Sequence, residues 1–169
     1  MQAGKSSIQF EHPPIITSAA SIVGQTEGEG PLASFFDRVE PDPTFGKKSW
    51  EEAESELQRQ TVQKCLDKAG RQAADVNCLF AGDLLGQIVA TSFGVESFDI
   101  PFFGLYGACS TMGEAMILGA MTAGADYADR VLALASSHFA SAERQFRFPL
   151  AYGNQRPQST TWTVTGCGC

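Results

Sequence analysis

Apolar residues in this chain form short runs, and the runs alternate between the spacing of strands and the spacing of helices. Five runs rich in branched or aromatic residues predict strands, at residues 13–24, 75–82, 100–106, 130–137 and 160–169. Three further runs between them predict helices, at residues 49–70, 84–95 and 111–124. Strands that alternate with helices favour an α/β fold, with a mostly parallel five-stranded sheet and helices on both of its faces.

The clearest predicted helix begins at Ser49. Ser49 and Glu52 have the spacing of a capping box, in which each side chain bonds the backbone N–H of the other residue. Apolar residues then recur along one helical face, at Trp50, Ala53, Leu57, Val62, Cys65, Leu66 and Ala69. Gly70 is a natural end, because glycine readily adopts the left-handed conformation that closes many helices.

The helix predicted at residues 111–124 is different, because it carries apolar residues on nearly every side. A helix of that kind is expected to be buried all round. Two stretches are predicted as loops: residues 25–48, which are rich in Gly and Pro with one short helical turn, and residues 138–159. A loop as long as the first is usually functional or part of an interface.

Composition and charge narrow the possible partners. The 169 residues suit one domain. The formal charge of −7 argues against nucleic acid as the main partner, because phosphate binding needs a basic field. No stretch approaches the ~20 apolar residues of a membrane helix, and residues 1–20 lack the apolar core of a signal peptide. We therefore expect only peripheral association with a membrane. Five cysteines without framework spacing favour free thiols in a reducing compartment.

One of these cysteines stands between a predicted strand and a predicted helix. Cys109 follows Gly107 and Ala108 and precedes Thr111 and Glu114, which have capping-box spacing. A thiol there lies near backbone N–H groups and the positive end of a helix, which favours the thiolate. Free cysteine is also among the most buried residue types. The residue types alone therefore leave a nucleophile, a ligand contact and core packing open.

The order of the segments resembles the first half of the thiolase and ketoacyl-synthase superfamily, in which a nucleophilic cysteine begins a buried helix at this position. A narrower resemblance, from about residue 10 to the C-terminus, is to the stage V sporulation protein AD family. It rests on six segments: "FEHPPIITSAASIVG", "EGEGPLASFFD", "AGDLLGQ", "IPFFGLYGACST", "SSHFASAERQFRFP" and "TTWTVTGCGC". The fifth segment is the most specific of the six.

This resemblance implies a thiolase-like fold that serves binding and not catalysis. The resemblance implies a receptor for dipicolinic acid (pyridine-2,6-dicarboxylic acid). This ligand is taken up into developing bacterial spores as the free acid or its calcium chelate. Members of the family have two related halves, so we expect residues 1–169 to form an N-terminal half-domain only, with the second half absent. We further expect a homodimer, contacts with other proteins of the spore uptake machinery, and a position on the cytoplasmic side of the spore, peripheral to its inner membrane. No cofactor is implied.

A ligand with an aromatic ring and two carboxylates needs Arg side chains, hydroxyls and backbone N–H groups at helix starts. In open α/β sheets such sites lie beyond the carboxyl ends of strands, and three predicted strand ends carry suitable groups. By resemblance, the expected ligand-binding residues are Asp83, Cys109, Ser110, Ser136, Ser137, His138 and Arg147, with Arg144 and Glu143 as further candidates.

Structural roles stay open for several of these residues. Asp83 can cap the following helix, and His138 can be a hydrogen-bonded loop histidine. The stem of Arg147 can cover apolar surface, and Glu143 with Arg144 can form a solvated ion pair.

Two cysteines at the end of the chain depart from the family, which has a Gly- and Ala-rich strand there. Cys167 and Cys169 supply only half of a tetrahedral zinc site, so we expect no metal site.

Three classes of function remain. In an acyl-transfer enzyme, Cys109 would attack a thioester with the help of a general base and oxyanion donors, which in the superfamily come largely from the second half. In a binding module, the same pocket holds a dicarboxylate without covalent chemistry. In a structural subunit, the half-domain docks on another chain and carries no site. We favour the binding module, without a catalytic residue.

Overall fold

The structure, a computed structural model, describes residues 2–85, 88–146 and 164–169. Its centre is a six-stranded sheet in the order β4-β3-β8-β7-β5-β6. The strands are β3 (Ser21–Gly24), β4 (Arg38–Glu40), β5 (Cys78–Asp83), β6 (Phe102–Gly104), β7 (Val131–Ser137) and β8 (Gly166–Gly168). Only β8 runs antiparallel to its neighbours. The mostly parallel α/β fold is therefore confirmed, with six strands in place of the predicted five.

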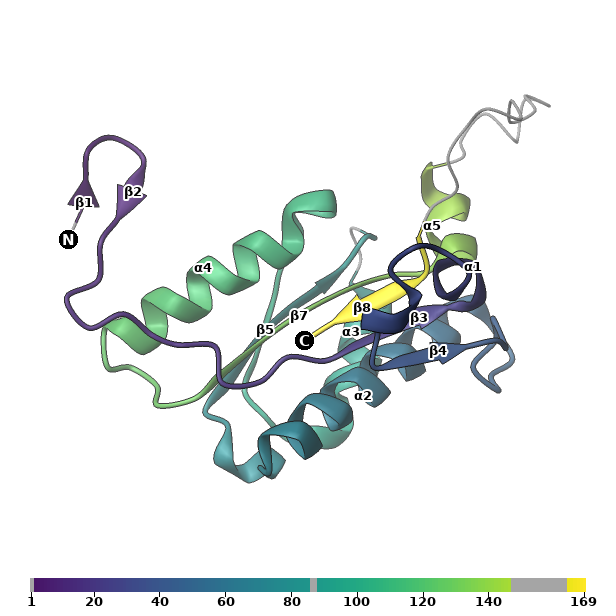
Figure 1. Cartoon of the computed structure of the whole chain (residues 1–169), viewed down its shortest axis with the longest axis horizontal. Helices are drawn as coiled ribbons and strands as arrows, with labels where there is room; N and C mark the ends of the chain where they lie inside the picture. The colour runs from purple at the N-terminus through teal and green to yellow at the C-terminus, as the bar shows by residue number, and fades with distance from the viewer. Residues whose placement is uncertain (1, 86–87, 147–163) are drawn as a thin grey trace.

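Helices cover both faces of this sheet (Figure 1). The long helix α2 (Trp50–Ala69) and the short helix α3 (Val89–Val95) pack on one face, which we call the α2 face. Helix α4 (Thr111–Gly124) packs on β5 and β7 from the other side, which we call the α4 face. Two further helices, α1 (Gln25–Gly28) and α5 (Phe139–Phe146), follow β3 and β7.

Helix α2 begins and ends as its sequence predicts. The Ser49 side chain accepts a hydrogen bond from the Glu52 N–H, and the Glu52 carboxylate accepts one from the Ser49 N–H, at 3.2 and 3.1 Å. Gly70 ends the helix with a φ of 62°, in the left-handed region. The apolar face of α2 fills the larger core, where Leu57 and Val62 pack with Leu79 of β5.

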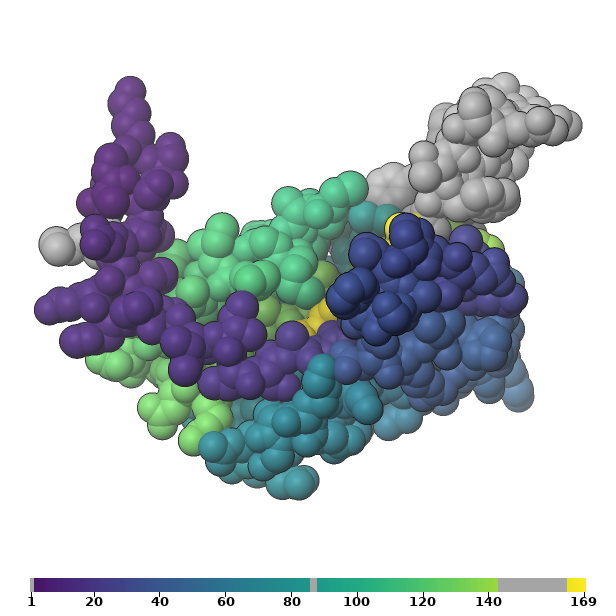
Figure 2. All heavy atoms as spheres, viewed as in Figure 1, coloured from purple at the N-terminus to yellow at the C-terminus, as the bar shows by residue number. Residues whose placement is uncertain are grey.

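The α4 face holds a smaller core and leaves much of α4 uncovered. Ala115 packs there against Phe80, while Met116, Ile117 and Met121 are 45%, 59% and 42% exposed. The prediction that α4 is buried on all sides is therefore wrong for this chain. Only one side of the helix lies on the sheet, and its other side is apolar in sequence but faces outward (Figure 2).

Several short elements differ from the sequence-based expectation. Strand β4 and helix α5 lie in stretches predicted as loops. The first strand occupies only residues 21–24 of the predicted 13–24, and Ile15 and Ile16 are 80% and 74% exposed. Single turns of 3-10 helix occur at Ala33–Phe35, Ala73–Asp75, Glu96–Phe98 and Ala108–Ser110.

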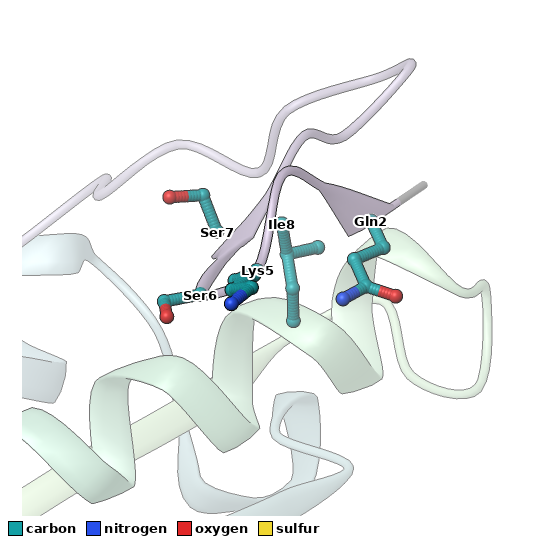
Figure 3. A pocket seen from close by; sticks show the side chains of 5 residues that line it. All are labelled: Gln2, Lys5, Ser6, Ser7 and Ile8. Carbon is teal, nitrogen blue, oxygen red and sulfur yellow. The ribbon is translucent and has the colours of Figure 1, made fainter.

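The N-terminus forms a small hairpin of β1 (Gln2–Ala3) and β2 (Ser7–Ile8) beside the C-terminal end of α4 (Figure 1). Gly124 lets the ring of Phe10 approach α4, because a Cβ at that position would lie 2.6 Å from the ring. A hollow lined by Gln2, Lys5, Ser6, Ser7 and Ile8 opens inside this hairpin (Figure 3). The hollow lies at the opposite end of α4 from Cys109. Within the described ranges, no helix is both long enough and apolar enough to span a membrane.

Candidate functional site

The alternation of side chains along β7 separates the predicted site residues into two groups. Ser136 points to the α2 face, where its hydroxyl bonds Glu54 and Gln58. Ser137, the next residue, therefore points to the α4 face. Its hydroxyl oxygen is buried and has no hydrogen-bond partner within residues 2–85, 88–146 and 164–169. Adjacent serines that the sequence places in one site thus face opposite sides of the sheet.

The cysteine turn lies on the α4 face and is held by its own hydroxyls. The Thr111 hydroxyl accepts a hydrogen bond from the Gly107 N–H at 3.2 Å and donates to the Ala108 carbonyl at 2.9 Å. The Ser110 hydroxyl donates to the Gly107 carbonyl at 2.8 Å. Ser110 therefore does not cap α4, and the predicted Thr111–Glu114 capping box is replaced by these bonds within the turn. Cys109 is exposed at the tip.

The backbone of this turn is strained. Ala108 has a φ of 47°, in the left-handed region that residues with a Cβ seldom adopt. Such a conformation costs on the order of 1–3 kcal/mol and is typical of functional sites. The strained residue directly precedes Cys109, which is exposed at the start of α4.

Glycine in β5 allows the turn to approach the sheet. A Cβ at Gly82 would lie 2.2 Å from the Leu105 carbonyl oxygen and 2.7 Å from Cγ2 of Thr111. The Leu105 N–H donates to the Ala81 carbonyl at 2.8 Å and fixes the segment that leads into the turn. Gly82 also pairs with Ala135 of β7, two residues before Ser137. The turn therefore sits over the carboxyl ends of β5 and β7, on the side to which Ser137 points.

Asp83 ends β5 on the other side of the sheet and is fully buried. Its Oδ1 accepts a hydrogen bond from the Leu85 N–H at 2.9 Å. Its Oδ2 accepts bonds from the N–H and the hydroxyl of Thr91, at 3.0 and 2.7 Å. Both oxygens thus hold the connection between β5 and α3.

His138 also lies inside the α2 side of the molecule and is fully buried. Its Nε2 donates to the Pro43 carbonyl at 2.8 Å, and its Nδ1 accepts from the Ala140 N–H at 3.2 Å. The ring stacks on Trp50 and on Phe139, at centroid distances of 5.5 and 5.0 Å, and these two rings also contact each other. Burial lowers the pKa of His138, although its bond to Pro43 opposes that shift. The imidazole is therefore neutral near pH 7 and has both nitrogens engaged.

A buried polar network on the α2 face was not found from the sequence. Glu54 accepts hydrogen bonds from the hydroxyls of Ser136 and Ser141, at 2.8 and 2.5 Å. The Gln58 amide donates to the hydroxyls of Ser136 and Thr91, at 2.6 and 3.0 Å. Burial raises the pKa of Glu54 to about 7, although its two serine donors oppose that shift. A signal was present, because residues 54, 58, 61 and 65 follow one another along a single helical stripe.

The remaining predicted residues lie at the edge of the described chain or beyond it. Glu143 and Arg144 belong to α5, but their side chains are outside those that the structure describes. Arg147 lies outside the described residues altogether. Of the seven main candidates, the structure brings Cys109, Ser110 and Ser137 to the α4 face. It places Asp83, Ser136 and His138 on the α2 side.

Similar proteins identify the family of the chain. The family model described as Stage V sporulation protein AD (SpoVAD) matches residues 4–169. The Stage V sporulation protein AD of Bacillus subtilis (strain 168) is 42% identical over 165 residues, which cover 98% of this chain and 49% of that protein. Among solved structures, the priming β-ketosynthase from the R1128 polyketide biosynthetic pathway aligns with a TM-score of 0.59 and 13% identity, over 98% of this chain and 51% of that one.

These matches agree with one another. At 13% identity the ketosynthase shows the fold alone, and that fold is thiolase-like. The chain spans about half the length of both proteins that it matches. The family model and the identity to the Bacillus protein extend over nearly all of the chain, which therefore belongs to the stage V sporulation protein AD family.

Proposed function

We propose that this chain provides part of a non-catalytic binding site for dipicolinic acid, as the free dianion or its calcium chelate, and that the protein serves uptake of this ligand into developing spores. The proposed site lies on the α4 face, at the carboxyl ends of β5 and β7. Its contacts are Cys109, Ser110, Ser137 and Arg147. In this proposal Asp83, Ser136 and His138 stabilise the α2 side of the domain and do not contact the ligand.

One observation carries the proposal: small hydrogen-bonding groups from two strand ends lie on the α4 face. Cys109 and Ser110 are exposed at the start of α4, and the Ser137 hydroxyl is buried without a partner in the described part of the chain. Buried hydroxyls nearly always have a partner in folded proteins, so an unpaired one at a strand end is suited to a ligand oxygen. Dipicolinate offers carboxylate oxygens to such donors.

His138 is not placed to act as the general base of an acyl transfer, a group that the superfamily takes largely from its second half. A cysteine nucleophile needs a general base within hydrogen-bond reach. His138 is the only histidine near the predicted site in sequence, and both of its nitrogens are engaged on the α2 side, with Pro43 and Ala140.

Charge explains why the proposal includes Arg147. The chain carries a net charge of −7. Glu114 also adds a carboxylate close to the turn, because a Cβ at Gly107 would lie 2.8 Å from its Oε2. A dianion would be repelled there unless a guanidinium or a bound calcium ion offset the charge.

Calorimetric titration of the complete protein with dipicolinate, with and without calcium, tests this proposal. We expect Arg147→Ala to weaken binding by roughly tenfold to hundredfold, because a charge-assisted contact is lost. Arg147→Lys should recover only part of the affinity, because the planar fork is lost. The matched control is Arg130→Ala, an exposed arginine at the opposite end of β7, which should leave binding unchanged. Wild-type protein that does not bind dipicolinate would contradict the receptor function.

A second candidate function, acyl transfer with Cys109 as the nucleophile, is favoured by the strained turn. The φ of 47° at Ala108 holds an exposed thiol at a helix start, which suits a nucleophile. Time-dependent thioester turnover that disappears in Cys109→Ala would support the enzyme. Its absence, together with dipicolinate binding, would support the receptor.

The proposal extends to partners and location. The exposed apolar residues of α4 offer a surface for association, either in a homodimer or with other proteins of the uptake machinery at the spore inner membrane. Light scattering tests the homodimer. A stable monomer at high concentration would contradict it, and stable assembly on a partner without any ligand binding would favour a structural subunit.

A further inference from the structure

Three cysteines lie together where α2 packs against the end of the sheet. Cys65 is on the last turns of α2, Cys167 is in β8, and Cys169 follows β8 directly. Cys65 and Cys167 are 3% and 4% exposed, and Cys169 is half-buried. Cys167 and Cys169 are two residues apart along an extended segment, so both side chains point to the α2 face.

Two of these cysteines are in contact, through the thiol of one and the backbone of the other. The Cys65 Sγ lies 3.6 Å from the Cys169 carbonyl oxygen and 3.9 Å from the Ser18 hydroxyl. Two backbone bonds between Cys169 and Ala20, at 2.8 and 2.9 Å, fix Cys169 beside β3. The sheet and α2 thus hold together two thiols that are 104 residues apart in sequence.

The contact makes one thiol easy to ionise. The hydrogen bond with Cys169 lowers the pKa of Cys65 to about 7, against the effect of burial. The same contact and burial raise the pKa of Cys169. The pair therefore loses its first proton near neutral pH and keeps the second, as coupled thiols do. Burial raises the pKa of Cys167, which stays a thiol.

We propose that Cys65 and Cys169 form a reversible disulfide when the protein is exposed to a hydroperoxide, and that Cys167 is not part of this disulfide. The Cys65 thiolate attacks one oxygen of hydrogen peroxide, the O–O bond breaks, and the leaving hydroxide takes a proton to become water. Cys169 then attacks the sulfur of the Cys65 sulfenic acid, the S–S bond forms, and a second water leaves. Two thiols are oxidised and one peroxide is reduced to two waters. A small oxidant suits this site, because Cys65 is only 3% exposed.

The disulfide would join α2 to the segment that follows β8. Strand β8 lies between β3 and β7, so the bond would link the centre of the sheet covalently to the 20-residue helix α2. The oxidised protein should therefore have a higher melting temperature than the reduced protein. This redox site is independent of the proposed ligand site, which lies on the α4 face.

Peptide mapping without reduction tests the proposal directly. The folded chain is treated with hydrogen peroxide at pH 6, 7 and 8, and free thiols are then blocked with N-ethylmaleimide. We expect the tryptic peptide 65–68 to be linked to the peptide that contains Cys167 and Cys169, with the loss of two hydrogens, and dithiothreitol to release it. The initial rate should rise about tenfold from pH 6 to pH 8, following the thiolate fraction of a thiol with a pKa of about 7.

Cysteine substitutions show which two thiols form the disulfide. The background is Cys109→Ser, which removes the exposed thiol that would otherwise cross-link molecules. Cys167→Ala should keep the link, and Cys169→Ala should abolish it and leave Cys65 as a sulfenic acid that dimedone traps. Cys65→Ser should also abolish the link, and if that variant does not fold, Cys169→Ala gives the same answer at a half-buried position. The matched control is Cys78, a buried thiol on the α4 face of β5, which should stay reduced.

Two results would overturn the proposal. In the first, N-ethylmaleimide labels both Cys65 and Cys169 fully after peroxide treatment at pH 8. In the second, the linked peptide persists in Cys169→Ala and disappears in Cys167→Ala, which would assign the disulfide to the wrong thiol of the pair.

Discussion

The two faces of the sheet differ most in how they cover apolar groups. Each face has one buried polar atom without a hydrogen-bond partner in the described chain, Gln58 Oε1 on the α2 face and the Ser137 hydroxyl on the α4 face. On the α2 face, a continuous chain of hydrogen bonds runs from Asp83 to Glu54, and Leu57 beside it is fully buried. On the α4 face, the Ser137 hydroxyl is buried without a partner in the described chain, and Ile117 is 59% exposed. The difference indicates that the α2 face stabilises the domain, whereas the α4 face is available for binding.

Truncating an apolar side chain should destabilise the protein far more on the α2 face than on the outward side of α4. Leu57→Ala should lower the free energy of unfolding by about 2–5 kcal/mol, because it opens a cavity in the larger core. Ile117→Ala, on the outward side of α4, should change it by less than about 0.5 kcal/mol. Urea denaturation of both variants provides the measurement. A loss of several kcal/mol in Ile117→Ala would show that α4 is covered on both sides in solution.

The buried carboxyl on the α2 face should give stability a distinctive dependence on pH. The pKa of Glu54 in the folded protein is raised from 4.5 to about 7, so the folded state holds this proton more strongly than the unfolded state does. The contribution of protonated Glu54 to the free energy of unfolding is therefore fully present below pH 4.5 and is lost as the pH rises through about 7. The loss should be on the order of 3 kcal/mol.

Glu54→Gln is the control for that dependence, because it keeps the shape of the side chain and cannot ionise. Denaturation midpoints of the wild type and the variant should converge at low pH, where the wild-type carboxyl is neutral like the amide, differ in slope between pH 5 and pH 7, and differ most above pH 7. Parallel slopes would show that Glu54 does not titrate in this window and that its carboxyl is ionised when buried.

A substitution at Gly82 tests how closely the cysteine turn packs on β5, on the α4 face. Gly82→Ala should destabilise the protein by about 1–3 kcal/mol, because the new Cβ would lie 2.2 Å from the Leu105 carbonyl oxygen and push the cysteine turn outward. The matched control is Gly113→Ala in α4, where nothing lies within 4 Å of the new Cβ. That change should stabilise the helix by up to about 1 kcal/mol. Thermal melts that rank the two variants the other way would contradict the packing of the turn on β5.

Local signals in the sequence were enough to define the main helices. Ser49, Glu52 and Gly70 fix the two ends of α2 through contacts within a few residues, and the prediction is confirmed. Strand β4 was missed, because its three residues gain strand geometry from pairing with β3, which no local pattern records. The burial of α4 was overestimated for a related reason. An apolar sequence shows that a surface needs a partner but not that the partner is present.

The candidate site was predicted only in part. The sequence gathered Ser136 and Ser137 into one site, although a strand with a period of two places neighbours on opposite faces. That inference was possible from the predicted strand at 130–137. The roles of Asp83 and His138 were not decidable, because their partners Thr91 and Pro43 come from other elements.

Two adjacent serines point to opposite faces of the sheet, and one paired measurement tests the consequence for binding most directly. In the complete protein, Ser137→Ala and Ser136→Ala are compared by dipicolinate calorimetry and by urea denaturation. Ser137→Ala should weaken binding by roughly threefold to tenfold and leave the free energy of unfolding within about 0.5 kcal/mol, because its hydroxyl has no partner to lose within the described residues. Ser136→Ala should leave the dissociation constant unchanged and lower the free energy of unfolding by about 1–3 kcal/mol, because Glu54 and Gln58 each lose a partner. The reverse result, with binding lost at Ser136 and stability lost at Ser137, would contradict the assignment of the α4 face as the ligand face.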